Sequence, residues 1–257
     1  MAHKMMIGGS IHEISSGKMM INGTVHDIAK GKAMIDGTVM EIPFGGLTVG
    51  KLPVGSSVYA NVNGTKKEFI VVHQGLPSSL YDDSCDGTWL WQAVSQRDNF
   101  FNSGSSTVDY KSSKICTYLN DTYLPLLDAN VQSAIKTVKI PYINGNGETG
   151  TVGSGANGLS TRVFLLSVYE LGFTAASHSA VPAKEGERLS YFASNTPSRA
   201  KQFLTRSPSK DNPSFVLSVT TANKVNPAAV ASSYLATHPA FILPANTAID
   251  ESNNILA

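Results

Sequence analysis

The chain has 257 residues, of which 42% are hydrophobic and 15% charged, a composition that indicates one folded domain with an appendage. With 20 basic and 19 acidic residues, the chain lacks the excess of positive charge that nucleic acids and anionic membranes attract, so we expect neither partner. No stretch approaches the roughly 20 apolar residues that span a bilayer, and the N-terminus lacks a signal-peptide core. We therefore expect no membrane insertion and no export by the general secretory route.

Three copies of a 14-residue unit open the chain, at residues 4–17, 18–31 and 32–45. Each copy holds a dipeptide that suits a two-residue hairpin turn with positive φ: Gly8-Gly9, Asn22-Gly23 or Asp36-Gly37. Each copy is therefore predicted to be a β-hairpin. Because a lone hairpin is marginal in water, the copies need partners, and we expect them to serve attachment or oligomerisation, most simply as a homotrimer. A stem that only spaces the main domain is the alternative.

The repeats also carry histidines, which raises the question of a metal site. His12 and His26 occupy the same repeat position, but the third copy has Met40 there, which favours ordinary surface residues. We place the domain boundary between Gly45 and Leu52. The expected organisation is a repeat region at 1–45 and a main domain at 46–257.

The main domain is predicted to mix short strands with helices. Strands are expected at 69–73, 89–94, 162–167, 202–207, 215–220 and 240–243, each apolar and bounded by Gly, Pro, Asn or Ser. Helices are expected at 112–119, with a serine cap, and at 128–135, with an aspartate cap. Ser167 and Glu170 form a capping box that predicts a further helix start. The predicted fold class is α+β.

Seven segments in order carry a resemblance to a known family: DGTWLW, KICTYLNDTYLPLL, VQSAIKTVKIP, VFLLSVYELGF, RLSYF, FLTRSP and HPAFILP. Over about residues 55–245 the chain resembles a domain family of uncharacterised function, found in gut bacteria and their phages, with a C-type-lectin-like fold. The repeats resemble those that precede this domain in phage tail proteins. The resemblance implies a receptor-binding module at a tail-fibre tip, related in fold to the variable proteins that retroelements diversify.

In that group the binding face lies between two anchor motifs. Here they are Leu204–Pro208 and Ala236–Phe241, with His238 where the family usually has Arg. Between them, alternation predicts a strand with Phe215, Leu217 and Val219 in the core and the other face outward. Polar adaptable residues and one aromatic follow, as in many recognition surfaces. The predicted ligand-binding residues are Asp211, Asn212, Ser214, Ser218, Thr220, Asn223, Lys224, Asn226, Ser233 and Tyr234. The predicted core anchors are Phe203, Arg206, Phe215, Leu217, Phe241 and Leu243.

Nothing in the sequence predicts catalysis, a cofactor or a metal. Cys85 and Cys116 have no CxxC spacing, and they lie in the N-terminal half, whereas the sulfatase-modifying enzymes of the lectin-like superfamily carry paired thiols near the C-terminal part. The histidines 73, 178 and 238 lack partner patterns, and no GxSxG occurs. The acidic run 82–86 lacks the ligand spacing of a calcium loop.

These observations favour a phage or prophage tail receptor-binding protein, located at the tail-fibre tip of the virion and made in the host cytoplasm. Its expected partners are a host cell-surface receptor, glycan or protein, and tail or baseplate proteins that hold the repeats. A bacterial surface or secreted adhesin with the same domain is one alternative. A divergent enzyme of the formylglycine-generating type is another.

Overall fold

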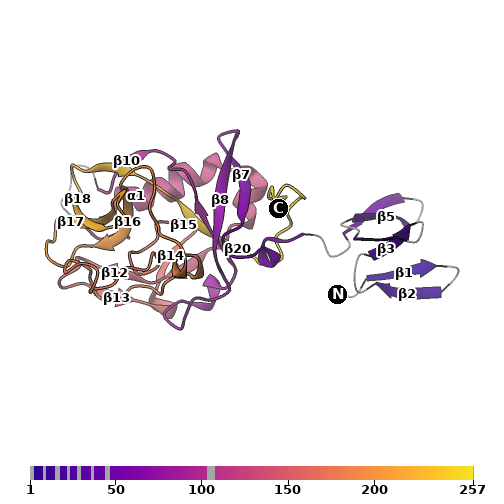
Figure 1. Cartoon of the computed structure of the whole chain (residues 1–257), viewed down its shortest axis with the longest axis horizontal. Coiled ribbons are helices and arrows are strands. Elements are labelled where there is room, and N and C mark those ends of the chain that lie inside the picture. The colour runs from indigo at the N-terminus through magenta and orange to yellow at the C-terminus, as the bar shows by residue number, and fades with distance from the viewer. Residues whose placement is uncertain are drawn as a thin grey trace. The chain divides into compact units, whose positions relative to one another are not determined.

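The computed structural model describes residues 47–102 and 108–256 in full and, within residues 3–43, the backbone of the strands. The chain divides into two compact units, Met1–Thr48 and Val49–Ala257, which we call unit 1 and unit 2 (Figure 1).

Unit 1 consists of three antiparallel strand pairs, one for each repeat. The pairs are β1 (His3–Ile7) with β2 (Ser10–Ile14), β3 (Lys18–Ile21) with β4 (Thr24–Asp27), and β5 (Lys30–Ile35) with β6 (Thr38–Pro43). The same register recurs in each copy, since Met5 faces His12, Met19 faces His26 and Ala33 faces Met40. The predicted turn dipeptides and all side chains of residues 1–46 lie outside the described residues.

The first sheet of unit 2 is antiparallel, with β9 (Thr88–Gln92) at its centre and β7 (Ser57–Val62) at one edge. Every residue of β9 is buried. The edge strand β7 is covered by the C-terminal segment, because the amide of Tyr59 donates to the carbonyl of Asn253 (2.9 Å) and the amide of Ile255 to the carbonyl of Tyr59 (3.0 Å). The strand order is β15 (Val163–Phe164), β20 (Ala240–Leu243), β9 (Thr88–Gln92), β8 (Thr65–Gln74) and β7 (Ser57–Val62).

The second sheet of unit 2 contains the segment in which the binding residues were predicted. Its order is β10 (Asp98–Phe100), β19 (Tyr234–Ala236), β16 (Phe203–Pro208), β17 (Phe215–Val219) and β18 (Val225–Ala229). Phe203 and Ala236 pair in parallel, and the other strand pairs are antiparallel. In Figure 1 the strands β16 to β18 lie at one end of unit 2 and β7 and β8 toward the other.

Two two-stranded pairs and several short helical segments complete unit 2. The pairs are β11 (Val138–Ile140) with β14 (Leu159–Thr161) and β12 (Tyr142–Asn144) with β13 (Thr151–Gly153). The α-helix α1 (Lys114–Thr117) runs into the π-helical η3 (Tyr118–Tyr123) and the 3-10 turn η4 (Leu124–Leu126), and α2 (Ala129–Ala134) follows. The other 3-10 turns are η1 (Val49–Lys51), η2 (Asp83–Cys85), η5 (Gly155–Asn157) and η6 (Ser190–Ala193).

The predicted α+β class is wrong, because unit 2 is built mainly from β-sheets. Strands account for 33% of the structure, and the two α-helices in the described residues have only four and six residues. Pro125 lies in the 3-10 turn that ends the first helical segment, where its ring excludes a longer helix. None of the described helices has the length and apolar character needed to cross a bilayer.

Three predicted helix signals act differently from the expectation. Asp128 is the N-cap residue of α2, but its side chain makes no capping bond, and its Oδ2 accepts from Asn61 Nδ2 (2.8 Å) instead. The cap of α1 is Ser113 rather than Ser112, since its Oγ accepts from the amide of Cys116 (3.2 Å). The capping box also forms, because Ser167 N donates to Glu170 Oε2 (2.8 Å) and Glu170 N to Ser167 Oγ (3.2 Å). It closes only a turn, because Gly172 follows at φ +91°, a conformation that ends helices.

Candidate ligand-binding site

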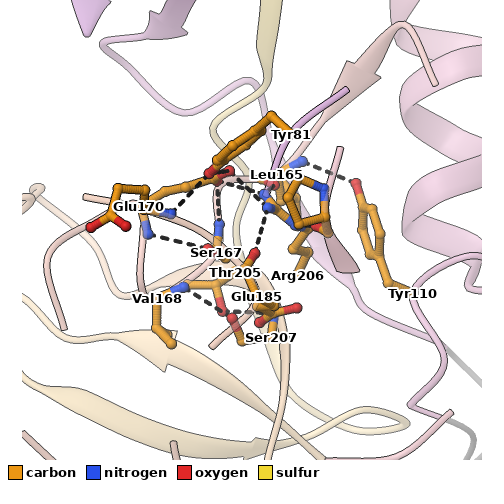
Figure 2. A network of polar contacts seen from close by, with 12 residues as sticks. Tyr81, Tyr110, Leu165, Ser167, Val168, Glu170, Glu185, Thr205, Arg206 and Ser207 are labelled. Carbon is orange, nitrogen blue, oxygen red and sulfur yellow. Dashed lines mark hydrogen bonds and ion pairs between the residues drawn. The ribbon is translucent and has the colours of Figure 1, made fainter. Parts of the chain in front are cut away.

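A buried ion pair fixes the strand on which the predicted binding segment begins. Arg206 and Glu170 are both fully buried, and their side chains form two parallel bonds, Nη1 to Oε2 (2.5 Å) and Nη2 to Oε1 (2.7 Å). Arg206 also donates to the carbonyls of Pro141 (3.0 Å), Leu165 (2.8 Å) and Glu185 (3.3 Å), so that all five guanidinium donors are used. Figure 2 shows this network with Arg206, Glu170 and Glu185 as sticks. The predicted role of Arg206 as a core anchor is confirmed.

Further side chains hold Glu170 in place. The hydroxyl of Tyr81 donates to Oε1 of Glu170 (2.8 Å), and the same hydroxyl accepts from the amide of Glu187 (3.1 Å). A second buried carboxylate, Glu185, accepts from the amide of Ile143 (3.2 Å), while its Oε1 has no hydrogen-bond partner. Burial raises the pKa of Glu185 to about 7. The network is therefore a structural anchor that contains one incompletely satisfied acid.

The ten predicted binding residues do not form one continuous face. The β16–β17 connection and the β17–β18 turn lie at opposite ends of β17, whose five residues span roughly 17 Å. The first group, Asp211, Asn212 and Ser214, is stabilised locally by a bond from Ser214 N to Asn212 Oδ1 (2.8 Å). The second group contains Thr220, Asn223, Lys224 and Asn226, and the third contains Ser233 and Tyr234.

Ser218 and its strand contradict the predicted alternation of inward and outward residues. Val216 and Ser218, predicted to face outward, are fully buried, whereas Phe215, predicted as a core anchor, is only half-buried. The hydroxyl of Ser218 donates to the carbonyl of Asn226 (2.7 Å) and accepts from Gln202 Nε2 (2.8 Å). A hydroxyl that is hydrogen-bonded in this way can be buried at little cost. Ser218 is thus a structural residue rather than an outward one.

Tyr234 is an exposed aromatic residue that lies beside the half-buried Phe100 and Tyr118. It has 52% of its surface exposed, the highest of any aromatic residue in the described part of the chain. Its ring lies 5.0 Å from that of Phe100, its partner across β10 and β19. The guanidinium of Arg97 stands 5.0 Å from the ring of Tyr118. Burial raises the pKa of Tyr118, although the charge of Arg97 lowers it. We call Phe100, Tyr118, Tyr234 and Arg97 the aromatic patch.

Sequence reasoning found Tyr234 but missed the rest of the aromatic patch. Phe100 lies on a strand of three residues and Tyr118 on a π-helical turn of six. Both elements are too short to show a clear hydrophobic periodicity in the sequence. More than a hundred residues separate them from Tyr234 along the chain. Only the pairing of β10 with β19 brings the rings together.

Asn223 borders a pocket of about 280 Å³. None of the residues that line this pocket belongs to the aromatic patch. Its apolar lining residues are Leu171, Phe173, Phe192, Ala193 and Pro197. Ser194, Asn195 and Thr196 contribute polar groups to the lining. Asn223 itself has φ +57°, and its Oδ1 is buried without a hydrogen-bond partner. We call this the Asn223 pocket.

The thiols and histidines lie in surroundings that suit structure better than catalysis. Cys85 and Cys116 are free and buried, and burial raises their pKa values to about 12 and about 11, which disfavours a thiolate at neutral pH. Nδ1 of His73 accepts hydrogen bonds from the hydroxyl (2.8 Å) and the amide (3.3 Å) of Ser190. These contacts hold η6 against β8. Burial lowers the pKa of His238 to about 4, and its ring packs on Trp91 and Phe203. Across the residues described, no three His, Cys, Asp or Glu side chains gather as a metal site requires.

Comparison with known proteins assigns unit 2 to a family. Residues 86–245 match the family model described as Domain of unknown function (DUF6273). Because this match covers more than half of the chain, the protein belongs to that family. It includes the aromatic patch, the Asn223 pocket and both members of the Arg206–Glu170 pair. No curated protein and no solved structure matches the chain. The resemblance to phage and lectin-like domains stays a prediction.

Proposed function

We propose that this protein is a phage or prophage tail receptor-binding protein that attaches to a bacterial surface without catalysis. The observation that carries the proposal is the aromatic patch. Its rings come from β10, β19 and η3, and two of these elements are strands of a sheet that the Arg206–Glu170 pair anchors in the core. Exposed aromatic side chains on a rigid support dominate binding energies at interfaces because they bury much area for little lost entropy.

The division of the chain supports the same proposal. Unit 1 repeats one hairpin three times, and such hairpins are marginal unless they pack on partners. We propose that unit 1 joins three chains into a trimer and attaches them to tail or baseplate proteins, while unit 2 binds the receptor. Three copies of a weak site on one particle would raise the avidity without any new contact.

The buried thiols argue against a redox enzyme of the formylglycine-generating type. A nucleophilic cysteine needs an accessible thiolate, whereas both thiols here are buried with raised pKa values.

Adsorption to cells tests the proposal. Fluorescently labelled protein is mixed with a panel of gut bacteria, and bound protein is measured by flow cytometry for the parent and for Tyr234→Ala. We expect the substitution to weaken adsorption at least tenfold, since truncating a central aromatic residue commonly costs about 2 kcal/mol. Tyr59→Ala is the matched control, because Tyr59 is a half-buried tyrosine on β7 of the other sheet. Equal adsorption of a folded Tyr234→Ala protein and the parent would show that the patch is not the receptor site.

A further inference from the structure

A segment without helix or strand packs against the Arg206–Glu170 pair. It lies in the fully described stretch between β15 and η6, and we call residues 174–188 the Glu185 segment. Residues 174–177 and 183–184 are exposed, whereas Ala180, Glu185 and Gly186 are buried. Gly186 fits so closely that a Cβ placed there would lie 2.9 Å from Oγ of Ser167 and 3.1 Å from Cγ of Glu170. The segment therefore meets the network with one acid that is closed off from water.

The carboxylate of Glu185 lacks a cation of its own. All five guanidinium donors of Arg206 already bind Glu170 and three backbone carbonyls, one of which is the carbonyl of Glu185 itself. Oε2 of Glu185 accepts from the amide of Ile143 (3.2 Å), but Oε1 has no partner among the described residues. An ionised carboxylate in this position is costly, because burial disfavours the charge and Glu170 adds a second negative charge nearby.

The other groups around Glu185 do not change charge near neutral pH. Tyr81 and Tyr169 lie in the same cluster, and burial raises the pKa of both phenols above 10, so both stay neutral. Arg206 and the hydroxyl of Ser207 favour the ionised form of Glu185, yet burial outweighs them and raises the pKa of Glu185 to about 7. Glu185 is therefore the member of the cluster that gains or loses a proton near neutral pH.

The same segment holds the β16–β17 connection, which carries three of the predicted binding residues. The amide of Lys210 donates to the carbonyl of Ala180 (2.8 Å), and the hydroxyl of Ser179 donates to Oδ2 of Asp211 (3.0 Å). Both bonds join the Glu185 segment to exposed residues of the connection. A movement of the segment would therefore free Asp211 and the amide of Lys210 together.

We propose that the Glu185 segment is a pH-dependent strap, docked while Glu185 is protonated and released when Glu185 ionises. Release brings the carboxylate into water and frees the β16–β17 connection. The direction follows from linkage: an acid whose docked pKa lies above its ordinary value stabilises the docked state at low pH, and this contribution is lost as the pH rises through the docked pKa. The strap is a property of the network and does not depend on what unit 2 binds.

Hydrogen exchange followed by mass spectrometry tests the strap in the full chain. Exchange of peptides that cover residues 174–188 and 209–212 is compared at pH 6 and pH 8, after correction for the intrinsic exchange rates. With a docked pKa of about 7 and a released pKa of 4.5, the opening constant of the segment should rise about tenfold between these pH values. Peptides from β9 and β17 should keep their protection, because only the segment opens.

Two variants separate Glu185 from His178, the other group of the segment that can change charge near neutral pH. Nδ1 of His178 accepts from the amide of Ala180 (3.1 Å). Glu185→Gln removes the ionisation, so the protection of the segment should be the same at both pH values. His178→Gln, the matched control, should keep the tenfold change. A change that persists in Glu185→Gln, or that His178→Gln abolishes, would overturn the proposal.

The parent protein gives a decisive result without either variant. Equal corrected protection of residues 174–188 at pH 6 and pH 8 would refute the strap, because the segment would then stay docked whatever the charge of Glu185. An equal loss of protection in β9 at pH 8 would show that the whole of unit 2 opens, which also contradicts a local strap.

Discussion

Replacement of Arg206 by methionine is the substitution that tests the structural reasoning most severely. Methionine fills a similar length of side chain, so the change removes charge and hydrogen bonds more than volume. It leaves the carboxylate of Glu170 buried without its cation, and it leaves the carbonyls of Pro141, Leu165 and Glu185 without their donor.

The expected cost follows from these lost partners. Breaking a buried ion pair by removing one member costs about 3–5 kcal/mol, because the remaining charge stays buried. For a unit of about 200 residues, each kcal/mol lowers the melting temperature by about 2–4 °C. We therefore expect Arg206→Met to lower the melting temperature of unit 2 by roughly 6–20 °C.

The assay uses the two tryptophans of the chain, Trp89 and Trp91, which are both buried in unit 2. Their fluorescence during urea unfolding therefore reports unit 2 without a signal from unit 1. Glu170→Gln and the double variant complete a double-mutant cycle. Once Glu170 is neutral, Arg206→Met no longer strands a buried carboxylate at that position, so its cost should fall by about 2 kcal/mol or more.

Two results would refute this reasoning. An Arg206→Met protein that unfolds within 1 kcal/mol of the parent would show that the network contributes little. Additive effects of the two single substitutions would show that Arg206 and Glu170 act independently, despite their bonds of 2.5 and 2.7 Å.

Three further predictions concern acidity, thiols and assembly. The folded pKa of Glu185, about 7, lies above its ordinary value of 4.5, so the stability that its protonation gives is full below pH 4.5 and is lost as the pH rises through 7. Urea unfolding at pH 5 and pH 8 should therefore show Glu185→Gln gaining on the parent by roughly 1–3 kcal/mol at the higher pH, and an equal difference at both pH values would contradict this. Joint replacement of Cys85 and Cys116 by serine should leave adsorption to cells intact, and native protein should react slowly with a thiol reagent; lost adsorption at an unchanged melting temperature would contradict a purely structural role. Light scattering should show a trimer for the full chain and a monomer for residues 46–257, and a monomeric full chain at micromolar concentration would argue against the role of the repeats.

The sequence by itself determined the local features of this protein. The 14-residue period predicted the three strand pairs, because hairpin register follows from the spacing of turn residues and apolar runs. Apolar runs placed β8, β9, β16, β17 and β20 within a few residues of their ends. The Ser167–Glu170 capping box could also be predicted from the sequence, because its two hydrogen bonds join residues three positions apart.

Only the tertiary structure decided the fold class, the burial of Ser218 and the make-up of the candidate sites. The capping box closes only a turn because Gly172 follows at φ +91°, and its Glu170 also binds Arg206 and Tyr81 from distant segments, a role that the local pattern does not predict. The alternation of side chains along the strand predicts that Ser218 faces the surface. Its hydrogen bonds to Gln202 and Asn226 nevertheless allow it to be buried. The aromatic patch and the Asn223 pocket join side chains from widely separated segments. Such contacts depend on strand order and on loop paths, which the pattern of a single segment does not encode.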